Sequence, residues 1–196
     1  MFTLPRRIHH HQASRIAEAF LAAPRHAPDE TMVAAYAALS EQSSRWYQRL
    51  TTTRGRHRVR VVLTHHPEPY ANATELSASV RRDHLLELCP TNRDHDRRHP
   101  QLDTSVGGAY DRMRAVHDIV SHGWLGLAFD ADGEYSAWLV EDRLYTGMAR
   151  WALATELHGE HSVQWTTKDL ADHKATLLDR ALLRASRSEH APCASS

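Results

Sequence analysis

The sequence predicts a helix-dominated α+β fold, with a small β-sheet and a helical C-terminal half that carries a histidine and glutamate site. Apolar residues recur at helical spacing along most of the chain. Two short runs, 59–63 and 85–88, have the β-branched or continuous apolar character of strands. The 196 residues, 41% of them hydrophobic, suffice for one sizeable core. We expect one globular domain over residues 1–185 and a flexible Ser/Ala-rich tail over 186–196.

The first half is expected to alternate helices with the two strands. An amphipathic helix over 12–23 ends at Pro24, and Asp29 caps a longer helix over 30–50. After the first strand, Asn72 with Glu75 three residues later has the pattern of a capping box. That pattern predicts a third helix, which runs to about residue 82 and precedes the second strand.

The second half begins with a polar stretch over 90–108, rich in Pro, Asp and Gly, which predicts a long loop. Thr166 with Asp169 resembles a second capping box. After the loop, we expect helices over residues 109–123, 132–144, 146–158 and 166–185.

Composition narrows the class of protein. Lys plus Arg and Asp plus Glu are both 24, so the formal net charge is zero and a dedicated nucleic-acid-binding protein is not expected. Two distant cysteines form neither a disulfide framework nor a zinc motif. No apolar run has the length of a transmembrane helix, and the N-terminus lacks the pattern of a signal peptide. We expect a cytoplasmic protein, in the cytoplasm of a bacterial host if a phage encodes it.

The segment 115–122 (AVHDIVSH) places two imidazoles and a carboxylate in apolar, helix-forming sequence. Burying such groups is costly unless they are paired or bind a cation. Asp118 and His122 are four residues apart, so they share a helix face and can bind one ion. His117 and His122 are five apart, about 140° around an α-helix. Both bind one ion only if the helix is distorted or ends near Gly123; otherwise His117 supports the site from outside it.

Glutamates supply the remaining candidates for metal ligands. Glu134 and Glu141 are two helical turns apart on a face that includes Trp138, and Glu156 follows an apolar run. Together with the histidines, these carboxylates suit a divalent metal ion, namely iron, manganese or zinc. The alternative is structural: core histidines with satisfied hydrogen bonds, and an exposed acidic face paired with arginine.

A resemblance extends over most of residues 30–180. Its motifs are RAVHDxxxH from Arg114, GExxAW from Gly133 and ATExxGxxS from Ala154. They resemble a family of uncharacterised proteins of bacteriophages and actinobacterial mobile elements. The resemblance implies a core signature of five residues, namely His117, Asp118, His122, Glu134 and Glu156. It also implies that Glu41, from the long helix of the first half, joins them. This chain departs from the family at Glu141, where relatives carry histidine, and at His158 and His161.

The hypothesis is a metal-dependent enzyme of phage or mobile-element type. Glu41 or Glu141 would act as a further ligand or general base, and a small-molecule, phosphorylated or nucleotide-like substrate would be hydrolysed, or oxidised if the ion is iron. Arg97, Arg98 and the arginines of 54–60 are candidates to hold a phosphate. The sequence leaves the oligomeric state open.

Two alternatives remain. The pair His117 and Asp118 also resembles the adjacent His-Asp pair of HD-type phosphohydrolases. Such a site needs two more residues, for which the candidates are His95 or His99 and Asp130 or Asp142. The other alternative is a non-enzymatic accessory protein, in which the same residues form a buried polar network that specifies packing.

Overall fold

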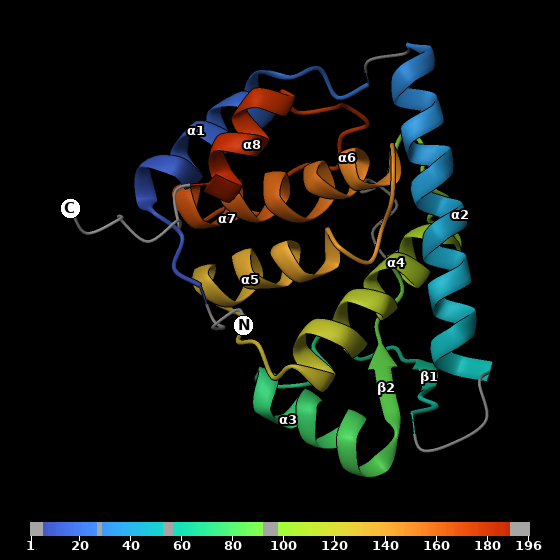
Figure 1. Ribbon diagram of the computed structural model, residues 1–196. Helices are drawn as coiled ribbons and strands as arrows, with labels where there is room; N and C mark the ends of the chain where they lie inside the picture. The colour runs from blue at the N-terminus through green and yellow to red at the C-terminus, as the bar shows by residue number, and fades with distance from the viewer. Residues whose placement is uncertain (1–5, 27–28, 53–56, 92–97, 189–196) are drawn as a thin grey trace.

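A computed structural model describes residues 6–26, 29–52, 57–91 and 98–188 (Figure 1). Helices dominate it, as predicted. Three π-helical segments, named η, continue from or into α-helices. The elements are α1 (His10–Ala22), α2 (Glu30–Thr52), β1 (Arg60–Leu63), α3 (Ala73–Ala78), η1 (Ser79–Asp83), β2 (Leu85–Leu88), α4 (Ala109–His117), η3 (Asp118–Trp124), α5 (Ala131–Glu141), α6 (Ala149–Leu153), η4 (Ala154–Gly159), α7 (Glu160–Thr167) and α8 (Arg180–Ser188).

The sheet consists of β1 and β2, which pair in parallel with Arg60 opposite Leu85 and Leu63 opposite Leu88. Parallel neighbours require a crossover connection, and α3 with η1 provides it (Figure 1). The predicted cap of α3 is confirmed, because the Asn72 side chain accepts a hydrogen bond from the Glu75 amide at 3.0 Å.

Two apolar clusters form the core, and the helix formed by α4 and η3 contributes to both. Tyr110 and Met113 of α4 lie in the larger cluster, with residues of α1, α2 and α5 to α8. Val116 and Ile119 lie in the smaller one, with the sheet and α3. α2 runs along one side of the molecule and packs on α4 and α6 (Figure 1). The His117–Asp118 segment therefore lies where the two clusters meet.

One predicted helix is wrong. The range 166–185 is not a single helix, because α7 ends at Thr167 and Lys168 adopts a left-handed conformation (φ +68°). Thr166 is not a cap: it lies within α7 and its hydroxyl donates to the Ser162 carbonyl. An irregular segment then leads to α8, which begins at Arg180.

The expected start of the flexible tail, at residue 186, is wrong, because α8 extends to Ser188. Ser186 is buried in α8, where its hydroxyl lies 2.7 Å from His158 Nε2 and its carbonyl accepts a hydrogen bond from the Tyr135 hydroxyl. Residues 189–196 lie outside the described residues. No helix in the described ranges is both long and apolar enough to cross a membrane.

The start of α5 leaves no room for a side chain at Gly133. A Cβ atom there would lie 2.0 Å from the Ala128 carbonyl oxygen, and the Gly133 amide donates to the cap residue Asp130 at 2.8 Å. We expect Gly133→Ala to lower the free energy of unfolding by at least about 2 kcal/mol, because the backbone must move. Urea unfolding measures this. An unchanged midpoint would contradict the close packing of this turn.

Candidate metal centre

The π-helical segment η3 brings His117 and His122 together. In an α-helix these residues would point in directions about 140° apart. A π-helix bonds residue i to i+5, so residues five apart come onto one face. The two rings lie edge to face with centroids 4.7 Å apart, and their Nε2 atoms are 2.9 Å apart. The expectation that a distorted helix is needed for both histidines to meet is confirmed.

Glu134 of α5 completes a buried group that can hold a metal ion. Its Oε2 lies 3.3 Å from His117 Nε2 and its Oε1 lies 3.3 Å from His122 Nε2. Donor atoms bound at about 2.1 Å to one tetrahedral or octahedral ion lie about 3.0–3.4 Å from one another. The observed separations therefore match those around a single metal ion. Exposure is low, 1% for His122 and 8% for both His117 and Glu134.

Both histidines direct Nε2 into this group because Nδ1 is used elsewhere. His122 Nδ1 lies 2.7 Å from the Leu127 carbonyl oxygen, which only accepts, so this nitrogen carries the proton. His117 Nδ1 lies 2.8 Å from Glu141 Oε1. If both rings are neutral, two lone pairs face each other across 2.9 Å. That arrangement requires a proton or a metal ion between the rings.

Glu141 orients His117 from behind. It is fully buried, and its Oε1 also accepts a hydrogen bond of 2.6 Å from the Ser121 hydroxyl. A carboxylate behind a ligating imidazole fixes the ring and raises its basicity. Glu134 and Glu141 thus both point inward from α5, as their spacing around Trp138 predicts, and reach opposite nitrogens of the same histidine.

His161 of α7 lies at the edge of the group. Its Nδ1 is 3.4 Å from Glu134 Oε2, and neither of these buried atoms has a hydrogen-bond partner among the residues that the structure describes. Its side chain is 24% exposed, more than those of His117, His122 and Glu134. Unpaired buried acceptors and donors are costly. A metal ion beside Glu134, or water bound to it, would satisfy these atoms.

The charges of the group are strongly coupled. Burial lowers the pKa of His117, but the Glu141 and Glu134 carboxylates outweigh it and raise that pKa well above the ordinary value. Burial raises the pKa of Glu134, yet the neighbouring histidines hold it well below its usual range. Burial lowers the pKa of His161, so this imidazole is neutral at pH 7. Without metal, these two carboxylates therefore favour the protonated form of His117.

This proton makes the metal-free protein sensitive to pH. Because the pKa of His117 is raised by folding, its contribution to stability is complete below about pH 6.5, the ordinary imidazole value. It is lost as pH rises through the raised pKa. We expect the melting temperature of chelator-treated protein to decrease as the pH rises through the raised pKa of His117. We expect His117→Gln to remove this dependence on pH. Identical pH profiles for the two proteins would contradict the assignment of the proton.

Two predicted residues lie away from this group. Asp118 is half-buried and lines a surface hollow with Tyr70 and Phe129. Glu41 is exposed on α2, where it forms an ion pair with Arg45 at 3.5 Å.

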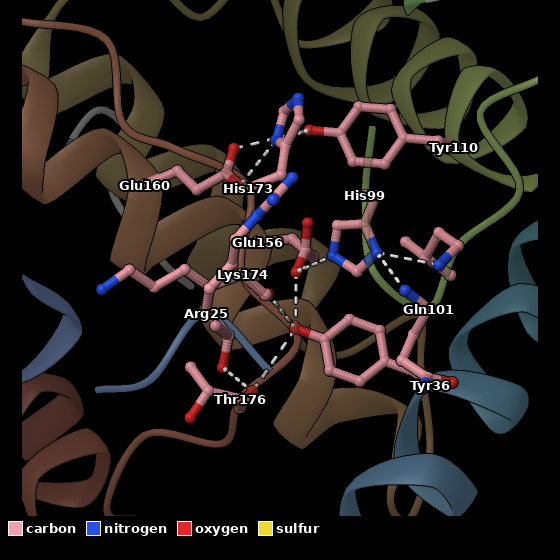
Figure 2. A network of polar contacts seen from close by, with 12 residues as sticks. Arg25, Tyr36, His99, Gln101, Tyr110, Glu156, Glu160, His173, Lys174 and Thr176 are labelled. Atoms are coloured by element: carbon pink, nitrogen blue, oxygen red, sulfur yellow. Dashed lines mark hydrogen bonds and ion pairs between the residues drawn. The ribbon is translucent and has the colours of Figure 1, made fainter. Parts of the chain in front are cut away.

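Glu156 belongs to a second buried cluster (Figure 2). Its Oε1 accepts a hydrogen bond of 2.6 Å from the Tyr36 hydroxyl and lies 3.2 Å from His99 Nε2. His99 Nδ1 accepts from the backbone amides of Gln101 and Leu102, so Nε2 carries the proton and donates to Glu156. Burial and the Glu156 charge raise the pKa of Tyr36 well above its ordinary value, which keeps this hydroxyl a donor.

Glu160, one helical turn beyond Glu156, extends the second cluster (Figure 2). Its Oε1 lies 3.0 Å from His173 Nδ1, and the Tyr110 hydroxyl lies 3.2 Å from the same nitrogen. Burial and the Glu156 charge raise the pKa of Glu160. The cluster ties α2, α4 and α7 to the segments around His99 and His173. The residues of the single histidine and glutamate site expected from the sequence are therefore divided between two clusters.

The candidate residues for an HD-type site do not lie together in the structure. His99 lies in the second cluster, Asp130 caps α5, and Asp142 pairs with Arg150 and Arg187. His95 and Arg97 lie outside the described residues, as do Arg54 and Arg56. Arg98 is exposed.

Two residues beside the metal group, His161 and Ser121, have only weak signals in the sequence. His161 is one of several histidines in the C-terminal half, and only its position on α7 beside α5 distinguishes it. Ser121 lies between two predicted ligands in the sequence. Only the π-helical turn directs its hydroxyl inward, where it donates to Glu141.

Comparisons with protein-family models, with curated proteins and with solved structures give no match.

Proposed function

We propose that the protein is a metal-dependent hydrolase with a mononuclear centre held by His117, His122 and Glu134. The supporting observation is the convergence of two imidazole Nε2 atoms and one carboxylate, with separations of 2.9–3.3 Å, in a buried site. Two histidines and one glutamate are a ligand set of catalytic zinc sites, which keep a further position for water or substrate. Such an ion lowers the pKa of its water and so supplies a nucleophile at neutral pH.

The surrounding residues have distinct roles in this proposal. Glu141 positions His117 and acts through it. His161 is the proton acceptor, because its Nδ1 has no hydrogen-bond partner within the described part of the chain, lies beside Glu134 and belongs to a neutral, partly exposed imidazole. A neutral imidazole in this position can take a proton from water or return it to a leaving group.

The test uses bis-p-nitrophenyl phosphate as a phosphodiester probe, with Zn²⁺ or Mn²⁺ added to the full-length protein. Glu134→Gln is expected to abolish hydrolysis, and His161→Asn to lower kcat about 100-fold and to remove the acidic limb of the pH profile. Glu41→Gln, the same change on the exposed face of α2, is the control and should retain full activity. Hydrolysis that survives Glu134→Gln would contradict the proposal.

A second candidate is oxidative chemistry at non-haem iron. Two histidines and one carboxylate with open positions also form the ligand set of iron oxygenases. Iron as the resident metal and oxygen consumption that depends on Glu134 would favour it over hydrolysis. The relation to phage and mobile-element proteins, and a cytoplasmic location, remain part of the proposal and are supported by the sequence resemblance and composition.

A further inference from the structure

The loop between α5 and α6, together with α6 and α8, lines a half-open surface pocket of about 420 Å³ whose described lining residues are all distinct from those of the metal centre. Ligand pockets for small molecules have volumes of about 300–1,000 Å³. The walls combine positive charge with aromatic and apolar surface. They include Arg150, Trp151, Arg180, Leu183, Arg184 and Arg187.

Among the described residues, four arginines and no acidic residue line this pocket. Arg150 and Arg187 both donate to one buried carboxylate behind the wall, that of Asp142. A single carboxylate between two guanidinium groups leaves this side of the pocket positive. The whole chain has a formal net charge of zero, so this is a local concentration of arginine and not a general excess.

Arg180 is the least constrained by charge. Within the described ranges, its guanidinium has no carboxylate partner, and it lies 3.9 Å from the centroid of the Trp151 ring. The Trp151 indole is fixed, because its Nε1 donates to the Leu178 carbonyl. Leu183, which also lines the pocket, is 2% exposed. The pocket therefore offers a planar, stacked surface beside guanidinium groups.

We propose that this pocket binds a small phosphorylated molecule with a planar ring, of the mononucleotide class. Guanidinium groups pair with phosphate through two parallel hydrogen bonds, which suits Arg180 and Arg184 on successive turns of α8. The ring would stack on the Arg180 and Trp151 surface and contact Leu183. The site lies between helices and has the volume of a small-molecule pocket, which favours a single nucleotide over a polymer.

The test is calorimetric titration of full-length, chelator-treated protein with AMP and with inorganic phosphate. Chelation makes the result independent of the metal centre, so this proposal and the proposed function can fail separately. AMP is expected to bind with one site per chain, and phosphate at least about tenfold more weakly because it lacks the ring. Higher salt should weaken both.

The decisive variant is Arg180→Gln with Arg184→Gln, and the control is Arg15→Gln with Arg82→Gln, an equal loss of charge at exposed positions outside the pocket. We expect the pocket variant to weaken AMP binding at least about tenfold and the control to leave it unchanged. Absence of AMP binding at millimolar concentration would overturn the proposal. So would equal loss in both variants, equal affinity for phosphate and AMP, or tighter binding of an oligothymidylate than of AMP.

Discussion

Glu134→Gln is expected to lower the affinity for Zn²⁺ or Mn²⁺ by at least about 100-fold. Replacing a residue that only orients a ligand typically costs 10- to 100-fold, and a ligand should cost more. The amide retains the size of the carboxylate but removes the negative charge that faces His117 and His122 at 3.3 Å. Competition with a chromogenic chelator measures the change.

Two control variants distinguish the loss of a metal ligand from the loss of a carboxylate elsewhere. Glu41→Gln makes the same chemical change at an exposed carboxylate and should bind metal like the wild type. Glu141→Gln leaves the ligands in place but weakens the hold on His117 Nδ1, so we expect an intermediate loss of about 10-fold or more. If Glu134→Gln and Glu41→Gln bind metal equally, Glu134 is not a ligand.

Glu156→Ala is expected to lower the free energy of unfolding by about 3 kcal/mol and to leave metal binding unchanged. The glutamate is 3% exposed, and its removal leaves a cavity and deprives the His99 N–H of its acceptor. Tyr36 loses its shortest hydrogen bond, although the carbonyls of Lys174 and Thr176 lie within reach of its hydroxyl. Urea unfolding and metal titration measure the two effects.

Tyr36→Phe provides the comparison for this variant. It removes one donor to Glu156 without a cavity, so a smaller loss of about 1–2 kcal/mol is expected. The double variant should lose less than the sum of the two, because both residues act through the same hydrogen bond. Loss of the metal in Glu156→Ala would show that Glu156 serves the centre, against the division into two clusters.

Regular periodicity made much of the fold predictable. The apolar stripe that includes Met32, Tyr36 and Leu39 predicts α2, and all three residues are buried. Asn72 predicts the start of α3 through its local hydrogen bond. These features depend on neighbours within a few residues. For the same reason, the inward direction of Glu134 and Glu141 followed from their spacing on one helix.

Features that depend on tertiary packing were not predictable. Nothing in the local sequence shows that η3 takes the wider turn that brings His122 to His117. Glu156 follows an apolar run, as an inward-facing ligand would, but its partners Tyr36 and His99 are distant in the chain. The break after Thr167 is also non-local, since the irregular segment is held by contacts such as that of His173 with Tyr110.

The metal content of purified protein, determined by elemental mass spectrometry, tests the central claim most directly. We expect about one equivalent of zinc, manganese or iron per wild-type chain, as a mononuclear site requires, and almost none in the double variant His122→Ala with Glu134→Gln. Chelator should also lower the melting temperature of the wild type. A metal-free wild type that takes up no added ion and melts at the same temperature with and without chelator would contradict the account, and the cluster would then be a protonated structural network.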